Sequence, residues 1–506
     1  MSIELQDRLN AGYTGDPILH VDALLKAEDV CLALDKLHTG KASGHDQIVT
    51  EHITHCHPVI YALLAKLFNI MIFSGYVPDD FGVGILIPIP KSDSTCGTHK
   101  LENFRGITLS PVISKIFEHC ILLVCSEYFV TSDNQFGFKS KVGCSHAIYT
   151  LRHVIDYHAR NYSTLNMCFV DVSKAFDRVS HPALFIKLLN RNVPRIIVIV
   201  LHNWYTNLSN YVQWGNHRSD VFTITAGVRQ GGILSPFLFT IYVNDMLDRL
   251  NDMGCSFHGY IIGAIMYADD LIFMSNSVYQ LQLMLQVCQH EISLLDLKIN
   301  LTKSVCMRVG HRFNIPCAKM SLGHGEIDWS DEVKYLGIYI KSGRDFMCDM
   351  TNNKKKFYRS SNAIFSKLSK FRNNMVVMKL ICSISLPTLI YANEALNLTK
   401  SQILSLDHTW TKAFFKVFST FDMQIIRQCQ LYGGYMPYAH IYAIARMNFL
   451  TRLKYTENKL INFIAFKTNP IEINELSATY NVSDNLTFVT KYRKIVQENF
   501  KNFVTS

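Results

Sequence analysis

The sequence lacks the features that mark disulfide-rich, zinc-ribbon and membrane proteins. Its 14 cysteines are scattered with no C-x-x-C pair, which argues against a zinc ribbon or a disulfide framework and fits a reducing compartment. The residues after Met1 do not form a signal peptide. No apolar run is expected to span a bilayer, because the nearest one, residues 61–77, carries Lys66 and Asn69. Repeats, low-complexity tracts and flexible linkers are also absent. We expect a soluble intracellular protein with no membrane partner.

The composition is that of a folded protein with several subdomains. The chain has 506 residues, of which 48% are hydrophobic and 12% aromatic, enough to build a large core. Its formal charge of +9 is moderate and favours a polyanionic partner without identifying one.

Helical and strand patterns alternate through the first two thirds of the chain. Helical spacing covers residues 21–37, 59–73, 110–129, 145–158, 181–189 and 235–250. Strand patterns cover residues 83–89, 167–170, 221–224, both sides of Asp269, and 333–340. Beyond Lys341 helical patterns dominate. The sequence therefore predicts an α+β protein with antiparallel hairpins, followed by an all-helical C-terminal region.

An acidic pair, Asp269-Asp270, interrupts a run of apolar residues. Two adjacent carboxylates with strand-like arms are costly to bury unless a divalent cation offsets their desolvation. A solvated turn at a hairpin tip explains the same pattern, and by itself the pair does not decide between a metal site and such a turn.

Two further features precede this pair. Asp171 follows an apolar strand pattern and could meet the acidic pair if the strands are neighbours in a sheet. Three such carboxylates could hold two Mg²⁺ ions, which polarise a 3′-hydroxyl and clamp a triphosphate. Between them, residues 227–236 form a glycine-rich turn that opens a helix, and such a backbone can approach a nucleotide closely.

A basic stretch without acidic residues begins at Lys354. At 100° per residue, its apolar side chains share one helix face and its cations occupy much of the opposite face. The alternatives are an ordinary solvated face and a contact with a nucleic-acid backbone. The candidate backbone contacts are Lys355, Lys356, Arg359, Lys367 and Lys370.

A histidine and cysteine cluster lies near the N-terminus. His52, His55, Cys56 and His57 are residue types that bind metal, but they crowd one short stretch and no second ligand cluster accompanies them. We expect no zinc site there.

The motifs in this order resemble those of reverse transcriptases. Residues 169–177, 227–236 and 267–270 resemble the three palm motifs, and residues 234–245 look like the non-LTR (LINE-type) retrotransposon branch. Flanking segments resemble other motifs of that branch, namely residues 40–46, 103–118, 135–139, 297–303 and 333–337. The resemblance covers roughly residues 25–420.

The resemblance implies an RNA-directed DNA polymerase with a right-hand arrangement of fingers, palm and thumb. Its partners would be an RNA template, a DNA primer and deoxynucleoside triphosphates, its cofactor two Mg²⁺ or Mn²⁺ ions, and its location the nucleus or cytoplasm. The sequence leaves its oligomeric state open.

The same resemblance implies a role for each matching residue. Asp171, Asp269 and Asp270 would be catalytic metal ligands, joined by the Val172 carbonyl, and Lys303 would protonate the departing pyrophosphate. Lys91 and Arg105 would grip the triphosphate, Phe176 would exclude a 2′-hydroxyl, and Gln230 would line the nucleotide pocket. The turn of Tyr335, Leu336 and Gly337 would position the primer end. The basic helix falls where the family's thumb lies.

The resemblance also predicts a linear division of the chain. Residues 1–60 would be an N-terminal extension with a finger motif, 61–345 fingers and palm, 346–420 the thumb, and 421–506 a helical region of open role. Relatives often carry an upstream endonuclease, and the short segment before the first helix leaves no room for one here.

The sequence departs from the family pattern in loops of the fingers. Ser43, His45 and Gln47 stand where prolines and a glycine are usual, and Gly106 replaces a proline. All three carboxylates are present, which favours a competent site. The alternatives are a non-catalytic nucleic-acid-binding protein derived from such a polymerase, and a group II intron maturase.

Overall fold

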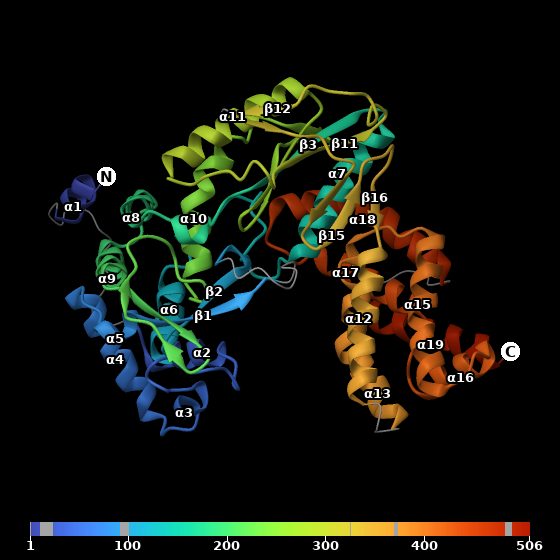
Figure 1. The fold of residues 1–506 in the computed structure, drawn as a ribbon, viewed down its shortest axis with the longest axis horizontal. Coiled ribbons are helices and arrows are strands. Elements are labelled where there is room, and N and C mark those ends of the chain that lie inside the picture. Colours follow the sequence, from blue (N-terminus) through green and yellow to red (C-terminus); the bar gives the residue numbers. More distant parts are fainter. Residues whose placement is uncertain are drawn as a thin grey trace. The chain divides into compact units, whose positions relative to one another are not determined.

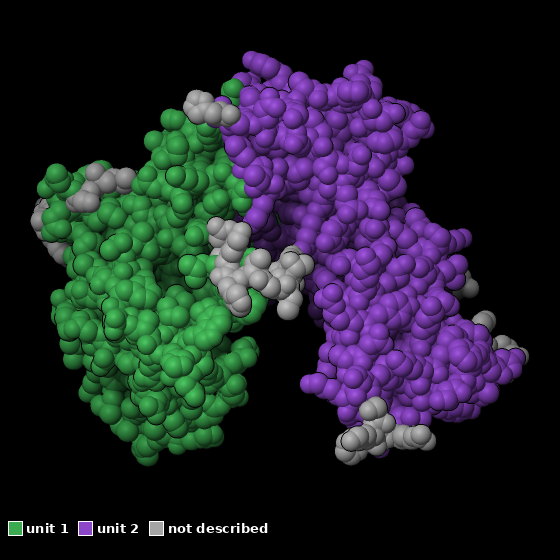
Figure 2. Space-filling model, viewed as in Figure 1, with its two compact units in different colours: residues 1–138, 171–250, 286–300 green, residues 139–170, 251–285, 301–506 purple. Residues whose placement is uncertain are grey.

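The computed structural model describes residues 2–10, 24–91, 101–323, 325–368, 373–480 and 488–505. The chain forms two compact units that alternate along the sequence (Figure 2). Unit 1 holds residues 1–138, 171–250 and 286–300, and unit 2 holds residues 139–170, 251–285 and 301–506. The predicted linear division into fingers, palm and thumb stays a prediction.

Unit 1 is built on a five-stranded sheet with the order β2-β1-β4-β5, in which β6 also pairs with β4. The β1–β2 ladder is antiparallel, whereas β1 and β4 run parallel. The strands are β1 (Val83–Pro90), β2 (Phe104–Leu109), β4 (Ser209–Trp214), β5 (His217–Arg218) and β6 (Phe222–Thr223).

Helices surround this sheet, and their aromatic side chains form much of the core of unit 1. The ring of Phe117 lies 5.0 Å from that of Phe68 and 5.6 Å from that of Trp204, which joins three helices at one point. The helices are α1 (Ser2–Asn10), α2 (Ala27–Asp35), α3 (Thr50–Thr54), α4 (Val59–Ser74), α5 (Asp79–Gly82), α6 (Val112–Val124), α8 (His181–Asn190), α9 (Arg195–Thr206) and α10 (Ser235–Asp248), with 3-10 turns at Leu101–Asn103 and η3 (Phe176–Arg178).

Unit 2 contains a four-stranded sheet with the order β11-β3-β10-β9. Its strands are β3 (Thr164–Asp171), β9 (Ala264–Tyr267), β10 (Asp270–Ser275) and β11 (Val305–Gly310). The two middle strands are apolar on both faces, as expected for buried strands. Asn166, near the start of β3, donates to the carbonyls of Ser275 and Asn276 at the end of β10, so β3 and β10 run in opposite directions.

Three small antiparallel elements complete the strands of unit 2. The ladders are β7–β8, β12–β13 and β14–β15–β16. The strands are β7 (Cys255–Phe257), β8 (Tyr260–Ile262), β12 (Met320–Leu322), β13 (Gly325–Ile327), β14 (Glu332–Tyr335), β15 (Ile338–Lys341) and β16 (Met347–Asp349). The single strand pattern over residues 333–340 is thus a hairpin.

Helices make up most of unit 2 after β16, as the sequence predicts (Figure 1). They are α12 (Thr351–Lys367), α13 (Asn374–Leu380), α14 (Leu386–Ile390), α15 (Lys400–Phe418), α16 (Met423–Tyr432), α17 (Tyr438–Leu453), α18 (Lys459–Thr479) and α19 (Phe488–Thr505), with α7 (Cys144–Arg160) earlier in the chain and a π-helical turn at Ile381–Ser385. Helix α11 (Val278–Leu294) passes from unit 2 into unit 1.

The C-terminal helices pack against α7 through a buried ionic network. Glu472 of α18 pairs with Arg152 of α7 at 2.6 Å and with Arg446 of α17 at 3.2 Å. Both arginines are no more than 3% exposed, so their charges require this carboxylate. The region after residue 421 is therefore an integral part of unit 2.

One stretch differs from the expectation about membrane spans. Residues 374–395 are long and apolar enough to cross a bilayer, by length and composition alone, and 33% of that window is buried inside the protein. The sequence reading missed it because it considered uninterrupted apolar runs. The stretch is divided into α13, a π-helical turn and α14 with Pro387 near its start, and core helices of soluble proteins pass the same test.

Most predicted elements form within a few residues of their expected bounds. The α+β class is confirmed. The helix expected over 21–37 is described as α2 only from Ala27, since residues 11–23 lie outside the described residues. The polar loop predicted over 92–100 also lies outside them.

Candidate active site

The β1–β2 hairpin of unit 1 carries both predicted triphosphate-binding cations. Arg105 lies opposite Ile89 in the ladder, and the Lys91 amide donates to the Asn103 carbonyl at 2.8 Å just beyond the last pair. Because residues 89 and 91 alternate to the same face, Lys91 and Arg105 are diagonal neighbours on one face, a spacing of about 7–8 Å between their backbones. Both side chains are exposed. The structure brings these two residues together.

The glycine-rich turn is fastened to the neighbouring strand β2. The Thr108 amide donates to the Gln230 carbonyl at 2.7 Å. Gly231 adopts a φ of 121°, and a Cβ there would lie 2.6 Å from the Thr108 carbonyl oxygen, so only glycine fits. The Gln230 amide group donates to the Asp177 carboxylate at 2.9 Å. Gln230 is therefore held at its backbone and at its side chain.

Phe176 sits between the glycine-rich turn and two other aromatic rings. It stacks on Phe239 with ring centres 4.5 Å apart and an angle of 18°, and Phe138 meets it edge-on at 6.2 Å. The Phe176 carbonyl accepts from the Val228 amide at 2.8 Å. The ring is half-buried, so one part packs in the core while the rest stays accessible. Both the core role and the gating role considered from the sequence are compatible with this position.

A buried carboxylate that sequence reasoning missed orders the same turn. Glu118 of α6 accepts hydrogen bonds from the amides of Ile233 and Leu234, the latter at 3.1 Å, just before α10 begins. Burial raises the pKa of Glu118, and the positive charge of Arg229 opposes that rise. A negative charge at a helix N-terminus is favourable, so Glu118 fixes both the turn and the start of α10. Its sequence signal was only a glutamate on an amphipathic helix.

Asp171 and Val172 enter unit 1 through a short antiparallel bridge. Val172 pairs with Ile299, while the Asn300 amide donates to the Asp171 carbonyl and the Ser173 amide to the Lys298 carbonyl, each at 2.8 Å. Because the flanking residues make these bonds, the carbonyl of Val172 points away from Ile299. This orientation is compatible with the predicted ligand role. The Asp171 side chain is half-buried.

The acidic pair lies where β9 turns into β10 in unit 2. Tyr267 pairs with Asp270, so Ala268 and Asp269 form a two-residue hairpin loop. Ala268 has a φ of 60°, a conformation that favours glycine, and holding it costs about 1–2 kcal/mol. Local strain of this kind gathers at functional sites. The predicted hairpin is confirmed, with Asp269 half-buried and Asp270 exposed.

The ends of the sheet strands bear on the predicted metal site. Strand β3 ends at Asp171 and β10 begins at Asp270. The exposed Lys303 lies two residues before β11. Carboxylate oxygens suit a hard divalent cation. Among the described residues no group of three or more His, Cys, Asp or Glu side chains is already arranged to hold a metal ion, so the joint role of the three aspartates stays a prediction.

The turn predicted to position a primer end closes the β14–β15 hairpin. Tyr335 pairs with Ile338, and the loop residues Leu336 and Gly337 have φ values of 41° and 85°. Tyr335 is 3% exposed, and its hydroxyl has no hydrogen-bond partner among the described residues. Burial raises the pKa of Tyr335, and the negative charge of Asp270 raises it further. The turn therefore lies close enough to the acidic hairpin for the two to interact electrostatically.

Helix α12 divides its faces as the sequence predicts. Phe357 and Ile364 are buried with Asn353 on one side. The predicted backbone contacts are exposed, namely Lys355, Lys356, Arg359 and Lys367. Lys370 lies outside the described residues. Whether this face binds nucleic acid stays a prediction.

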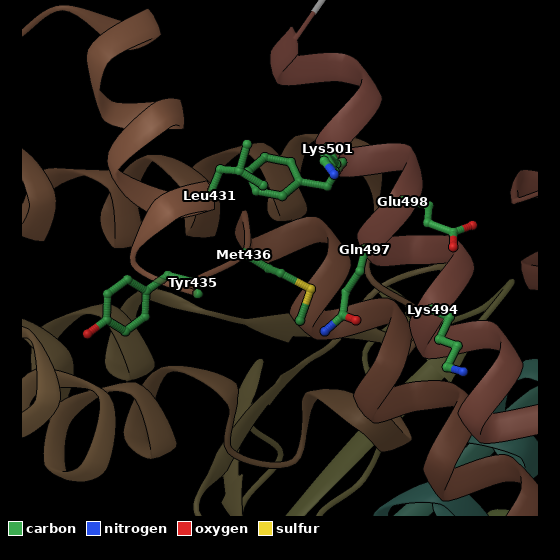
Figure 3. A pocket seen from close by; sticks show the side chains of 9 residues that line it. Leu431, Tyr435, Met436, Lys494, Gln497, Glu498 and Lys501 are labelled. Atoms are coloured by element: carbon green, nitrogen blue, oxygen red, sulfur yellow. The ribbon is translucent and has the colours of Figure 1, made fainter.

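The remaining candidate features do not join this site. The ring nitrogens of His52 and His57 accept the amides of Val49 and Val59, which gives them local structural roles. A cavity of about 270 Å³ lies between α19 and the α16–α17 connection, where Met436 and Gln497 point toward one another (Figure 3). None of the predicted site residues lines it.

Residues 89–340 match the family described as reverse transcriptase (RNA-dependent DNA polymerase). An RNA-directed DNA polymerase from the mobile element jockey of Drosophila melanogaster is 27% identical over 377 residues, which are 72% of this chain and 40% of that protein. A Pol polyprotein from the type-2 retrotransposable element R2DM of the same species is 25% identical over 56% of this chain and 27% of its own length. The chain thus spans less than half the length of these relatives.

Among solved structures, apo telomerase from Candida tropicalis is similar, with a TM-score of 0.41 and 16% identity, over 83% of this chain and 74% of that one. The predicted fold class, an α+β right-hand polymerase with a helical C-terminal region, is confirmed. The family implies catalysis that depends on a divalent metal. The chain therefore belongs to the reverse transcriptases, on the branch of the RNA-directed DNA polymerases of non-LTR retrotransposons.

Proposed function

We propose that this chain is an RNA-directed DNA polymerase that extends a DNA primer with deoxynucleotides on an RNA template. The observation that carries the proposal is the arrangement within unit 1. Phe176, Gln230 and the strand that bears Arg105 are joined by direct hydrogen bonds through Val228 and Thr108. A sugar-selecting ring, a pocket-lining amide and phosphate-binding cations are thus parts of one framework.

The cations would bind the incoming triphosphate. Lys91 and Arg105 share an exposed face of the β1–β2 hairpin, and fixed cations there would neutralise charge that develops on the phosphoryl oxygens. Phe176 is supported from behind by Phe239, so its ring cannot retreat easily from a 2′-hydroxyl. This backing supports a preference for deoxynucleotides.

The aspartates would supply the metal-binding part of the site. Asp171, Asp269 and Asp270, with the Val172 carbonyl, form an oxygen-only donor set suited to Mg²⁺ or Mn²⁺. Two bound ions would polarise the primer hydroxyl and neutralise the triphosphate. The end of β3 and the start of β10, neighbouring strands of opposite direction, support this convergence.

The chemistry is a single displacement at phosphorus. The primer 3′-oxygen forms a bond to the α-phosphorus as the bond to the bridging oxygen of pyrophosphate breaks, and the hydroxyl proton is released. The exposed Lys303 would donate a proton to the leaving pyrophosphate. The turn at Leu336–Gly337 would hold the primer end in line for attack.

Primer extension with purified chain tests the proposal. With an oligo(dT) primer on poly(rA), dTTP and Mg²⁺ or Mn²⁺, the wild-type chain should extend the primer. Asp171→Asn and Asp269→Asn should each lower the rate by about a hundredfold or more, while duplex binding stays within about twofold. A matched control is Asp7→Asn on helix α1, an exposed carboxylate outside the proposed site.

Two outcomes would contradict the proposal. Full-rate synthesis by either aspartate variant would remove the assigned site. Tight duplex binding without extension by the wild type would favour a non-catalytic nucleic-acid-binding protein. A preference for self-splicing intron RNA over other templates would instead favour the maturase alternative.

We further propose that the exposed cations of α12 contact the backbone of the template–primer duplex. Such work on RNA and DNA would take place in the nucleus or cytoplasm, which fractionation of cells expressing the chain would test.

A further inference from the structure

The turn at Leu336–Gly337 is not stable by its own sequence. A two-residue hairpin loop with both φ values positive favours asparagine or glycine at its first position, and here that position is Leu336 at 41°. A branched side chain in this conformation is strained, so contacts from elsewhere must hold the loop. The question is which residue supplies them.

Tyr391 contacts both residues of this loop. Its hydroxyl donates to the Leu336 carbonyl at 2.9 Å. Its ring lies beside Gly337, where an added Cβ would be 3.0 Å from the ring carbon Cε1. A single side chain thus fixes the carbonyl of one loop residue and limits the volume of the other.

The backbone of Tyr391 is in turn held by the basic helix α12. The side chain of Asn353 donates to the Tyr391 carbonyl at 3.2 Å and to the Leu389 carbonyl at 3.4 Å. Asn353 is 3% exposed and lies on the buried face of α12, while Lys355, Lys356 and Arg359 are exposed on the same helix. A short path therefore runs from the cationic helix through Asn353 and Tyr391 to Leu336.

A second contact links Tyr391 to the acidic hairpin. The Cys144 thiol at the start of α7 is within hydrogen-bonding reach of both the Tyr391 and Tyr267 hydroxyls. Tyr267 pairs with Asp270 across the β9–β10 hairpin. Tyr391 thus stands between the two turns whose relative position an in-line attack requires.

We propose that Tyr391 is a positioning residue that sets the primer-end turn at Leu336–Gly337 against both the acidic hairpin and the duplex-gripping helix α12. The proposal rests on the proposed polymerase function and deepens it. The Tyr391 hydroxyl does not touch the reacting atoms; it acts through the Leu336 carbonyl. Because Tyr391 is 39% exposed, removal of its hydroxyl should spare the fold.

Tyr391→Phe in the full chain tests this role, because it deletes the hydroxyl and keeps the ring. The single-turnover rate of the first nucleotide addition should fall by about five- to tenfold, as expected for one lost hydrogen bond. The Kd of the primer–template duplex should change by less than about twofold, since no cation is removed. A 2-aminopurine base at the primer 3′ end should fluoresce differently in the Phe variant, because the end is held less firmly.

Tyr432→Phe is the matched control, since Tyr432 is a tyrosine of the same unit that is 85% exposed. It should leave the rate, the Kd and the fluorescence unchanged. A Tyr391→Phe rate equal to that of the wild type would overturn the inference while the polymerase proposal stands. A fall in melting temperature larger than the control's, with unchanged primer-end fluorescence, would also overturn it, because the role would then be structural. A wild-type chain without extension would overturn both proposals.

Discussion

Glu118 offers the sharpest test of how unit 1 holds its glycine-rich turn. The side chain is 4% exposed and accepts the amides of Ile233 and Leu234. Arg229 is 6% exposed and lies over the Trp204 ring, where burial lowers the pKa of the guanidinium and the negative charge of Glu118 raises it. The two charges depend on one another.

Replacement of Glu118 has a cost that the geometry sets. Glu118→Ala leaves two amides and the Arg229 charge without their carboxylate, which should lower the free energy of unfolding by about 3–5 kcal/mol. Glu118→Gln keeps the side-chain volume and one acceptor but loses the charge, so about 2–3 kcal/mol is expected. In a unit of this size each kcal/mol corresponds to about 2–4 °C in melting temperature.

The same replacement should weaken nucleotide binding. Gln230 lies between Arg229 and Gly231, so a turn released from Glu118 should also release Gln230 from Thr108. We expect Glu118→Gln to raise the KM for dTTP by about three- to tenfold, with a smaller change in kcat. Urea unfolding and steady-state extension on poly(rA) measure the two effects.

Glu28→Gln serves as the control, because Glu28 is an exposed glutamate on α2 of the same unit. It should change stability by no more than about 0.5 kcal/mol. If Glu118→Ala unfolded within 1 kcal/mol of the wild type by the same urea assay, about the size of a single ordinary hydrogen bond, the argument from burial would be refuted.

Three other predictions concern sugar selection, duplex binding and acid stability. Phe176→Val should lower discrimination against ribonucleotides by about tenfold or more, and an unchanged ratio of kcat/KM values for dTTP and UTP would count against the gate. Replacing Lys355, Lys356 and Arg359 together by alanine should reduce the slope of log K against log salt by up to about 3, whereas an equal slope would remove α12 from the duplex interface. Burial lowers the pKa of His158 to about 4 from its ordinary 6.5, so the folded state keeps this ring neutral. Its contribution is present above pH 6.5 and is lost as the pH falls toward 4, about 2 kcal/mol that His158→Gln should remove from the pH dependence of urea unfolding.

Short-range patterns determined the elements and the order of the motifs. Alternating apolar residues around Asp269-Asp270 predicted the hairpin, and β9 and β10 confirm it. Helical spacing after Lys354 predicted the two faces of α12, because side chains three and four residues apart share a face whatever surrounds the helix. These features depend on neighbours in sequence, so the sequence alone could fix them.

Contacts between distant residues were decided only by the tertiary structure. Glu118 meets Leu234 across 116 positions, Tyr391 meets Leu336 across 55, and Arg152 meets Glu472 across 320. No local pattern distinguishes these side chains from others on an amphipathic helix, because their partners are set by how whole elements pack. The motifs therefore name the chemistry, whereas packing chooses the residues that hold the motifs in place.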